Sequence, residues 1–536
     1  GGGALAALAA RLASAPDRAV RAACAAALAS ALLPLSPHAA ASSLAVQGVC
    51  RELLSPPGLA ALEGLLDKGT ACAFQRAEGS GWGYARTGTL DGAFALLLAL
   101  SRLLGTSFTT GALVSSGLWA ICCRRLQTLS GATDLSPTGL RAALHLVLVT
   151  TTHCADCSAR AALLSGGDLP AALVASIKEE ALARLGKWPG SHGGGPDAVN
   201  AVVALVSRVL FLPLEASGQI GEGHAAEAPG SDMVRLQGSL LSLAVVSNLV
   251  KATAVLERWA LEPVVNLLSR LIMLPGARSA VQFVEAGGPS KQLVSKMLDP
   301  TNRPGLIVDA LILLSMLARI SRDYYPHLLR ADLFPPTLKL LRTSREASVR
   351  ARVCNLVGNL CRYSDFFFQA LLDSGILQEV VACAADEDAT TRKFACFALG
   401  NAAFHSAALY PALIPAIPPL VACLSEPLDK TRSNAAGALG NLVRNSPLLA
   451  PRLAAAGAVS ALIKAADPSG GVDGSTKVAL YSLGTVAAYT ECKEVVNAAG
   501  FLPTLRSLAD SQDRTTAKYA TRVMDRFHAT QPPPAQ

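Results

Sequence analysis

A mostly apolar segment with a glycine near its centre recurs through the second half of the chain. The residues from Phe394 to Leu399, just before Gly400, are all apolar, so a helix there has no polar face. A helix that is apolar all round is buried all round. Clear copies of this segment are SVRARVCNLVGNLCRYS (348–364), TTRKFACFALGNAAFHS (390–406), KTRSNAAGALGNLVRNS (430–446) and STKVALYSLGTVAAYT (475–490), with weaker copies at 306–321 and 238–253.

The spacing of these copies predicts a repeat of three helices. The marker glycines, Gly358, Gly400, Gly440 and Gly484, follow one another at intervals of 42, 40 and 44 residues. Between the copies, a first helix ends at a turn glycine and a second helix begins at once; the turn glycines are Gly375, Gly457 and Gly500. Three helices in such a period is the armadillo plan. We therefore predict an all-α fold, a right-handed α-solenoid of armadillo/HEAT-like repeats of about 42 residues.

The glycine-bearing helix is expected to be the third and central helix of each repeat. Glycine costs a helix about 1 kcal/mol relative to alanine, and we interpret it here as the point where a neighbouring helix approaches closely. Asp388 with Thr390, and Glu346 with Ser348, precede two of these helices. Such residues suit a helix N-terminus, where free N–H groups donate to side-chain oxygens and the helix dipole favours acids.

The pattern divides the chain into four predicted parts. Residues 1–213 form an irregular helical-repeat lobe with glycine-rich loops at 78–92 and 187–197. Residues 214–235 form a flexible connection because they lack apolar periodicity. The armadillo solenoid occupies 236–530, ending in a charged helix at 513–528, as an unstacked end requires. Residues 531–536 form a tail.

The composition and charge of the chain argue against nucleic-acid binding and against a membrane span. The chain is 51% hydrophobic but only 5% aromatic, which suits helix-on-helix packing, and its net charge of +8 is mild for 536 residues. The sequence contains no long run of lysine and arginine residues, which would indicate nucleic-acid binding. Three charge-free stretches are interrupted by prolines or polar residues, so we predict no membrane span. The sequence begins without an initiator methionine, and we interpret it as part of a longer protein.

The 13 cysteines give no strong sign of chemistry. Cys354 and Cys396 precede marker glycines by four residues, and Cys383 and Cys423 also recur in phase with the repeat. Such cysteines behave as small buried hydrophobes, and we therefore expect a reducing, intracellular compartment.

No motif in the chain predicts catalysis, a cofactor or a metal. The C-x-x-C at Cys154–Cys157 has no second ligand pair nearby, so an ordinary helix end is favoured over a zinc site. The glycine-rich run at 79–83 lacks the Gly-Lys-Ser/Thr of a phosphate loop. The protein-kinase motifs V-A-I-K, H-R-D and D-F-G are absent from these residues. We predict no catalytic residue, no cofactor and no metal in this segment.

Two rows of polar residues in register are the candidate partner-binding residues. Asn359, Asn401 and Asn441 each follow a marker glycine, and a row of amides on a solenoid can hydrogen-bond an extended partner. The alternative is that each asparagine ties down a neighbouring helix end. Arg350, Arg392 and Arg432 are also in register, six residues after an acid in the last two cases, a spacing that favours an inter-repeat ladder over a ligand site. These six residues are the predicted site.

The quoted segments also resemble a known family. TRKFACFALGNAAFHSAALYPAL and KTRSNAAGALGNLVRNSPLL are similar to the C-terminal armadillo region of the Fused family of serine/threonine kinases, plant members included, closely over 345–465 and less closely back to 235. The resemblance implies a kinase domain elsewhere in a longer chain. It also implies roles in Hedgehog signalling, in assembly of the central apparatus of motile cilia, and in cytokinesis with kinesins on microtubules.

Nuclear-import receptors share the general plan but carry a tryptophan four residues before the asparagine. Here Asn355, Phe397 and Gly437 occupy that place, which argues against cargo binding of that kind.

These patterns together predict a scaffold. We expect a non-catalytic protein-interaction segment that docks a Fused-like serine/threonine kinase onto a kinesin or other microtubule-associated protein. Its expected location is the cytoplasm and cytoskeleton, including the ciliary axoneme. The alternative is a kinase-independent armadillo adaptor for transport, adhesion or signalling. Whether the parent chain is an enzyme is left open by these residues.

Overall fold

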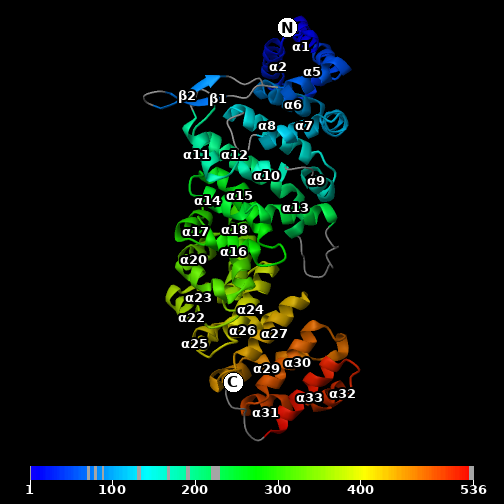
Figure 1. Ribbon diagram of the computed structural model, residues 1–536. Helices are drawn as coiled ribbons and strands as arrows, with labels where there is room; N and C mark the ends of the chain where they lie inside the picture. Colours follow the sequence, from blue (N-terminus) through cyan, green and yellow to red (C-terminus); the bar gives the residue numbers. More distant parts are fainter. Residues whose placement is uncertain are drawn as a thin grey trace. The chain divides into compact units, whose positions relative to one another are not determined.

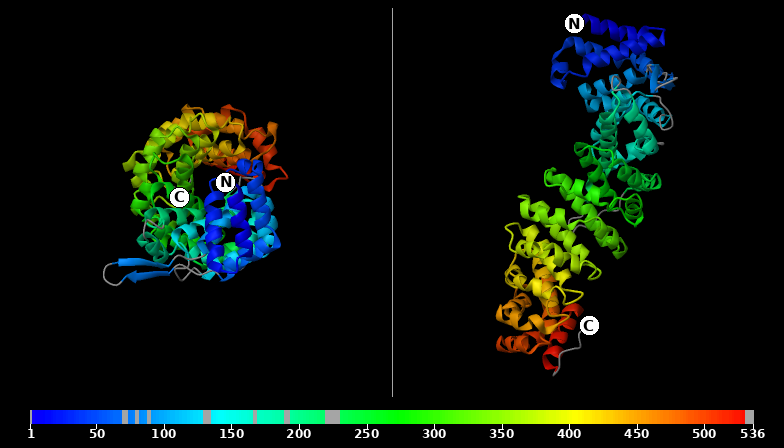
Figure 2. Two further views of the ribbon diagram at one scale, coloured as in Figure 1. Left: turned by 90° about the horizontal axis from the view of Figure 1, so that it is seen from above. Right: turned by 90° about the vertical axis from the view of Figure 1, so that its left-hand side faces the viewer.

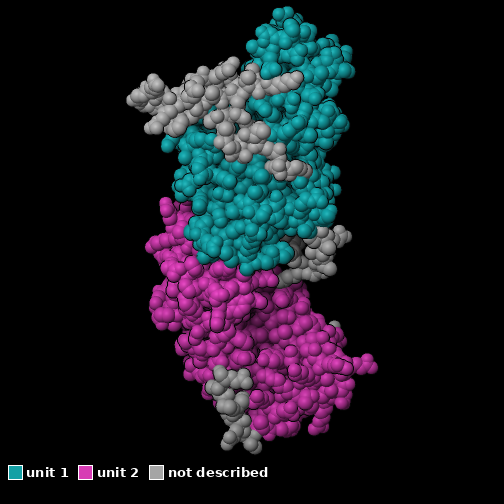
Figure 3. All heavy atoms as spheres, in the orientation of Figure 1, with its two compact units in different colours: residues 1–288 teal, residues 289–536 magenta. Residues whose placement is uncertain are grey.

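The computed structural model describes residues 2–68, 73–77, 81–86, 90–128, 135–165, 169–188, 193–218 and 230–529. The chain forms two compact units, Gly1–Gly288 and Pro289–Gln536, which Figure 3 colours separately. The sequence instead predicts a connection at 214–235. Residues 219–229 and the predicted tail at 531–536 lie outside the described residues, so the four predicted parts stay a prediction.

Unit 1, the first of the two, consists of helices with one strand hairpin (Figure 1). Its elements are α1 (Gly2–Ser14), α2 (Arg18–Leu32), α3 (Pro37–Ser42), α4 (Leu44–Leu53), α5 (Pro56–Lys68), β1 (Ala73–Ala77), β2 (Gly81–Arg86), α6 (Leu90–Leu104), the π-helix η1 (Ser107–Leu113), α7 (Leu118–Thr128), α8 (Pro137–Thr152), α9 (Cys157–Ser165), α10 (Leu169–Ala175), α11 (Glu179–Lys187), α12 (Pro196–Phe211), the 3₁₀-helix η3 (Leu212–Gly218), α13 (Ser231–Ser242), α14 (Val245–Ala252), α15 (Arg258–Leu271) and α16 (Arg278–Glu285).

The longer helices of unit 1 form a continuous row. α2 packs against α6, α6 against α8, α8 against α12, and α12 against α15. One helical stretch among the described residues, Pro196–Glu215, is long and apolar enough to cross a membrane, and three bent helix pairs would qualify if each were one span. In this fold 72% of the apolar window of Pro196–Glu215 is buried, and α12 lies between α8 and α15.

An antiparallel hairpin between α5 and α6 departs from the sequence prediction. β1 pairs with β2, in a part of the chain where we predict only a glycine-rich loop. The aromatic residues Phe74, Trp82 and Tyr84 are the strand signal that the glycines around them obscure. Residues 78–80 and 87–89 lie outside the described residues.

Unit 2 contains the predicted three-helix repeats. Its elements are α17 (Lys291–Met297), α18 (Pro304–Ile320), η4 (Arg322–Tyr324), α19 (Tyr325–Arg330), α20 (Phe334–Thr343), α21 (Ala347–Leu360), α22 (Phe368–Ser374), α23 (Ile376–Cys383), α24 (Ala389–Ala402), α25 (Tyr410–Leu413), η5 (Ile414–Ala416), α26 (Ile417–Cys423), α27 (Asp429–Asn441), η6 (Pro447–Leu449), α28 (Ala450–Ala455), α29 (Ala458–Ala465), η7 (Pro468–Gly470), α30 (Gly474–Val486), α31 (Thr490–Ala498), α32 (Leu502–Ala509) and α33 (Arg514–His528).

The third helices of unit 2 are α18, α21, α24, α27, α30 and α33, and each packs against the next. Figure 2 shows these repeats as successive layers in the green-to-red part of the chain. In α24, Ala395, Cys396, Ala398 and Leu399 are fully buried or nearly so. The prediction of an all-α solenoid of armadillo/HEAT-like repeats is confirmed, and the predicted third helix is the central one.

The turn glycines and most of the expected caps also lie where the sequence predicts them. Gly375, Gly457 and Gly500 have φ values of 71°, 72° and 62°, a left-handed conformation that glycine adopts without strain. Asp388 caps α24 by accepting a 2.7 Å hydrogen bond from the Thr391 N–H. Glu346 precedes α21 but makes no such side-chain bond, because glutamate is not among the side chains that suit this position.

Cysteines in phase with the repeat form buried pairs. Cys354 of α21 hydrogen-bonds Cys383 of α23, and Cys396 of α24 hydrogen-bonds Cys423 of α26. The hydrogen bond with Cys383, together with burial, raises the pKa of the Cys354 thiol well above its ordinary value. A buried thiol whose pKa is raised is a poor nucleophile. All four of these cysteines are buried, which agrees with the prediction of small buried hydrophobes.

The marker glycines differ in how closely the next helix approaches. A Cβ at Gly440 would lie 2.7 Å from Cβ and 3.0 Å from Cα of Ser482 in α30. A Cβ at Gly358 would lie 2.5 Å from the Phe397 ring. At Gly400 the nearest atoms belong to Ala438, at 3.5 Å and beyond, which is ordinary contact. Close approach therefore requires glycine at Gly358 and Gly440, whereas Gly400 leaves room for a methyl group.

We expect Gly440→Ala to lower the melting temperature of the chain and Gly400→Ala to maintain or raise it. Alanine gains about 1 kcal/mol over glycine in either helix. At Gly440 overpacking against Ser482 costs about 1–3 kcal/mol, whereas at Gly400 the methyl group meets no obstacle. Thermal unfolding followed by circular dichroism tests the pair. Equal melting temperatures for the two variants would contradict this difference between the glycine contacts.

Candidate protein-interaction surface

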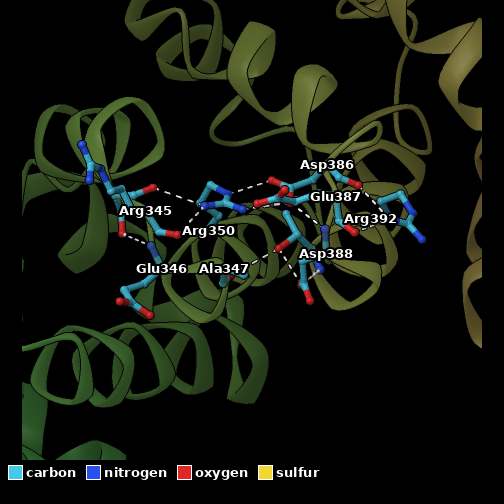
Figure 4. Close-up of polar contacts among 10 residues, drawn as sticks. Arg345, Glu346, Ala347, Arg350, Asp386, Glu387, Asp388 and Arg392 are labelled. Atoms are coloured by element: carbon cyan, nitrogen blue, oxygen red, sulfur yellow. Dashed lines mark hydrogen bonds and ion pairs between the residues drawn. The ribbon is translucent and has the colours of Figure 1, made fainter.

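Arg350 connects two repeats through a paired ion contact. Its Nε and Nη2 donate to the two carboxylate oxygens of Asp386 at 2.7 and 2.9 Å, while Nη1 donates to the carbonyls of Ser344 and Arg345 (Figure 4). The side chains of Arg350 and Asp386 are only 14% and 10% exposed. The hydrogen bond from Arg350 holds the pKa of Asp386 below its ordinary value.

The same arrangement recurs in the next two repeats. Arg392 donates from Nη2 to Glu426 at 2.8 Å, and Arg432 donates from Nη2 to Asp473 at 2.5 Å. In both cases Nη1 donates to two carbonyls in the turn before the arginine's own helix. Although burial opposes it, hydrogen bonds from Thr476, Ser475 and Arg432 lower the pKa of Asp473. The inter-repeat ladder favoured by the spacing is therefore present.

The asparagines in register also connect neighbouring repeats. Asn401 Nδ2 donates to the carbonyl of Gly358 at 2.8 Å, and Asn441 Nδ2 donates to the carbonyl of Gly400 at 2.9 Å. Asn359 is 4% exposed and donates to Ser315 Oγ at 2.8 Å. These contacts correspond to the structural alternative left open by the sequence. A role of the three asparagines and three ladder arginines in partner binding stays a prediction.

Two buried tyrosines complete the ends of third helices, a feature the sequence reasoning missed. The Tyr325 hydroxyl donates to the carbonyl of Asn359 at 3.0 Å, and the Tyr410 hydroxyl donates to that of Asn441 at 2.5 Å. Carbonyls in the last turn of a helix have no partner within the helix. The dipeptide Tyr-Pro occurs at both places, 325–326 and 410–411, and is the signal that could have found them.

The partly exposed face of the third helices combines arginines or lysines with aromatic rings. The Lys393 ammonium lies 4.5 Å from the ring centroid of Phe394, Arg444 lies 4.2 Å from that of Phe404, and Arg522 lies 4.3 Å from that of Tyr481. In such cation–π contacts the ring attracts the charged group electrostatically. This face of the third helices therefore presents basic and aromatic side chains together.

The other sequence motifs bring no chemical site together. The thiol of Cys154 lies near the carbonyl of Thr150 and that of Cys157 near the carbonyl of Leu212, as at a helix end. No group of three His, Cys, Asp or Glu residues in the described part of the chain could hold a metal. Unit 1 also has a cavity of about 660 Å³, lined by α11, α12 and α14.

Comparisons with known proteins agree with the repeat architecture. The model of the HEAT-like repeat matches residues 389–442. An engineered protein of known crystal structure is 20% identical, with a TM-score of 0.61 over 82% of this chain and 95% of its own. A designed armadillo repeat protein in complex with a peptide is 25% identical, with a TM-score of 0.41 over 44% of this chain and 98% of its own. The family model and the structure with a TM-score of 0.61 thus place the chain in the class of helical-repeat solenoids.

The curated relatives narrow this class. Serine/threonine-protein kinase TIO of Arabidopsis thaliana is 29% identical over 490 residues, 82% of this chain and 36% of that kinase. Serine/threonine-protein kinase 36 of Mus musculus is 29% identical over 322 residues, 58% of this chain and 23% of that kinase. The chain thus spans about a third or less of these relatives. The resemblance to the repeat region of Fused-type kinases is confirmed, and it extends beyond residues 235–465.

We expect Asp386→Asn to destabilise the chain more than Glu379→Gln. Asp386 is buried against Arg350, and a hydrogen bond to a charged group contributes on the order of 1.5–3 kcal/mol. Glu379 pairs with Arg342 at the surface, where the two side chains are 29% and 56% exposed, and such pairs contribute about 0–1 kcal/mol. Chemical denaturation at neutral pH measures the difference.

The same pair predicts a pH dependence. Because the pKa of Asp386 is lowered in the folded chain, its contribution is complete above the unfolded pKa of about 3.9 and is lost as the pH falls through the folded pKa. The free energy of unfolding of the parent should therefore fall more steeply in acid than that of Asp386→Asn. Parallel profiles would show that this ion pair does not contribute.

Proposed function

We propose that the chain is the non-catalytic scaffold segment of a Fused-like serine/threonine kinase, and that it docks the kinase to a microtubule-based assembly. The assembly would be the central apparatus of a motile cilium or a complex containing a kinesin. The similarity to two kinases over the repeat region is the observation that carries this proposal. A catalytic domain elsewhere in the parent chain and a cytoskeletal or axonemal location belong to the same proposal.

The fold supports a binding role, rather than a catalytic role, for this segment. A solenoid of repeats that each contact only their neighbours presents a long surface without a closed active-site cavity at its centre. In unit 2 the arginines and asparagines that recur in register form hydrogen bonds to a neighbouring repeat. What remains at the surface is the basic and aromatic face of the third helices, which suits protein binding.

Capture of partners by the immobilised chain tests the proposal. Extracts of ciliated cells are passed over the purified chain and over an unrelated helical-repeat solenoid of similar net charge. We expect kinesins, tubulin-associated or axonemal proteins to be enriched on the chain alone, as identified by mass spectrometry. Enrichment of nuclear-import, adhesion or vesicle proteins in their place would favour the kinase-independent adaptor.

Within this proposal the asparagines have a second role in partner binding. Asn401 and Asn441 are half-buried and donate to the preceding repeat. We expect the double variant Asn401→Ala/Asn441→Ala to lose about 1–3 kcal/mol of stability, from two hydrogen bonds worth about 0.5–1.5 kcal/mol each. We also expect about ten-fold weaker capture of the partner. A lowered melting temperature with unchanged capture would assign both asparagines to structure alone.

A further inference from the structure

The C-terminal ends of the third helices in unit 2 form a continuous edge. His405 Nε2 lies 3.1 Å from the carbonyl oxygen of Arg362, Asn445 Nδ2 donates to the carbonyl of Phe404 at 3.0 Å, and the Tyr489 hydroxyl donates to that of Val443 at 2.6 Å. Each contact joins one repeat to the one before it. Residues at the ends of α21, α24, α27 and α30 therefore follow one another along one edge.

Arginines and aromatic rings occupy this edge. We call Arg362, Phe404, Arg444, Arg522 and Arg526 the basic strip. Phe404 is 39% exposed and Arg362 is exposed, while the other three arginines are half-buried. Arg444 lies on the Phe404 ring and Arg522 on the Tyr481 ring, and Arg522 also donates to the Tyr481 carbonyl and to Thr485 Oγ1. The guanidinium groups of Arg444 and Arg522 are thus held in place by their neighbours.

The charges of the strip are not balanced within unit 2. Ladder arginines of the same third helices, such as Arg392 and Arg432, each pair with a carboxylate. Among the described residues, Arg444, Arg522 and Arg526 have no carboxylate partner in any ion pair. Burial, together with the positive charges of Arg526 and Arg444, lowers the pKa of Arg522. The nearest acid in sequence, Asp525, forms no ion pair with Arg522 or Arg526 within the described part of the chain.

We propose that the basic strip binds an extended acidic segment of a protein partner, with carboxylates on Arg444, Arg522 and Arg526. This inference rests on the proposed scaffold function and specifies the chemistry of its partner. Neighbouring third helices lie roughly 8–10 Å apart, and an extended chain rises about 3.3 Å per residue. The strip from α21 to α33 therefore matches a segment of roughly 12 residues. Acids at about every third position of such a segment place one near each helix of the row, including those that carry Arg444 and Arg526.

The arrangement favours separate carboxylates over a phosphate or a nucleic acid. The arginines are distributed over several helix ends, whereas a phosphate concentrates its charge at one point. Single-stranded nucleic acids bind by stacking bases on open aromatic faces. Here guanidinium groups lie over the Phe404 and Tyr481 rings. Charge complementarity with an acidic peptide satisfies the strip without displacing these contacts.

Fluorescence polarisation of the full 536-residue chain tests the strip. The probe is a labelled peptide of about 12 residues with glutamate at every third position, measured at about 0.15 M salt. We expect the glutamate peptide to bind at least ten-fold more tightly than its glutamine counterpart, and Arg444→Glu/Arg526→Glu to remove that difference. The control Arg452→Glu/Arg506→Glu, exposed on α28 and α32, changes net charge equally and should bind as the parent does.

A single variant and two further probes separate peptide binding from loss of folding and from binding of phosphate or nucleic acid. Arg526→Glu alone disturbs no described ion pair or ring contact, so we expect it to lose binding with an unchanged melting temperature. Tight binding only of a phosphoserine peptide, or equal binding of oligo-dT, would overturn the proposal. So would equal loss of binding in the control variant.

The partner-capture experiment keeps this inference distinct from the proposed function. Capture of cytoskeletal proteins by the parent but not by Arg444→Glu/Arg526→Glu supports both. Equal capture by that variant would overturn the strip as the docking site while the scaffold function stands. Failure of the parent to capture such proteins would overturn the scaffold function itself.

Discussion

The close stacking of one third helix on the next is the constraint on which unit 2 depends. A helix without a polar face is stable only when neighbours cover it on more than one side, and α21, α24, α27 and α30 each obtain that cover from the third helices before and after them. The Gly440–Ser482 contact shows how near two such helices come. The first and second helices of each repeat then cover only the surface of the third helices that this stacking leaves exposed.

Polar groups at the joints follow from the same constraint. Stacking buries the carbonyls at the ends of helices, and buried carbonyls need donors. Asn401, Asn441, Tyr325 and Tyr410 supply such donors across or within repeats, and the ladder arginines supply others together with charge pairing. These residues, which recur in two or three repeats, are therefore engaged in holding repeats together. Phe404 and Arg526, by contrast, break the register and belong to the proposed basic strip.

Much of this architecture could be predicted from sequence because it depends on period and local conformation. The interval between marker glycines indicated the repeat, the turn glycines indicated the left-handed turns, and the acid–arginine spacing indicated a ladder. The sequence could not show whether the asparagines stabilise the stack of repeats or bind a partner, since both roles require residues that recur in register. The Tyr-Pro signal went unused because it occurs in only two repeats.

Other features depend on tertiary geometry that a single sequence does not contain. Gly400 and Gly440 stand in nearly identical segments, yet one faces Ala438 and the other Ser482 at different distances. The backbone of the facing helix also lies closer to Gly440 than to Gly400, with the respective Cα atoms 3.0 and 3.6 Å from the added Cβ. The basic strip likewise gathers Arg444, Arg522 and Arg526 from two repeats, and only the fold shows that they are neighbours without an acid between them.

The unequal joints have a mechanical consequence. A row of helices that touch only their neighbours resembles springs connected end to end, so a tensile load on unit 2 is carried in full by every joint. At the α27–α30 joint a Cβ at Gly440 would lie 2.7 Å from Ser482 Cβ, whereas at the α24–α27 joint a Cβ at Gly400 would lie 3.5 Å from Ala438 Cβ. Tension along unit 2 would therefore act on joints of unequal closeness, with the α27–α30 contact the tighter of the two.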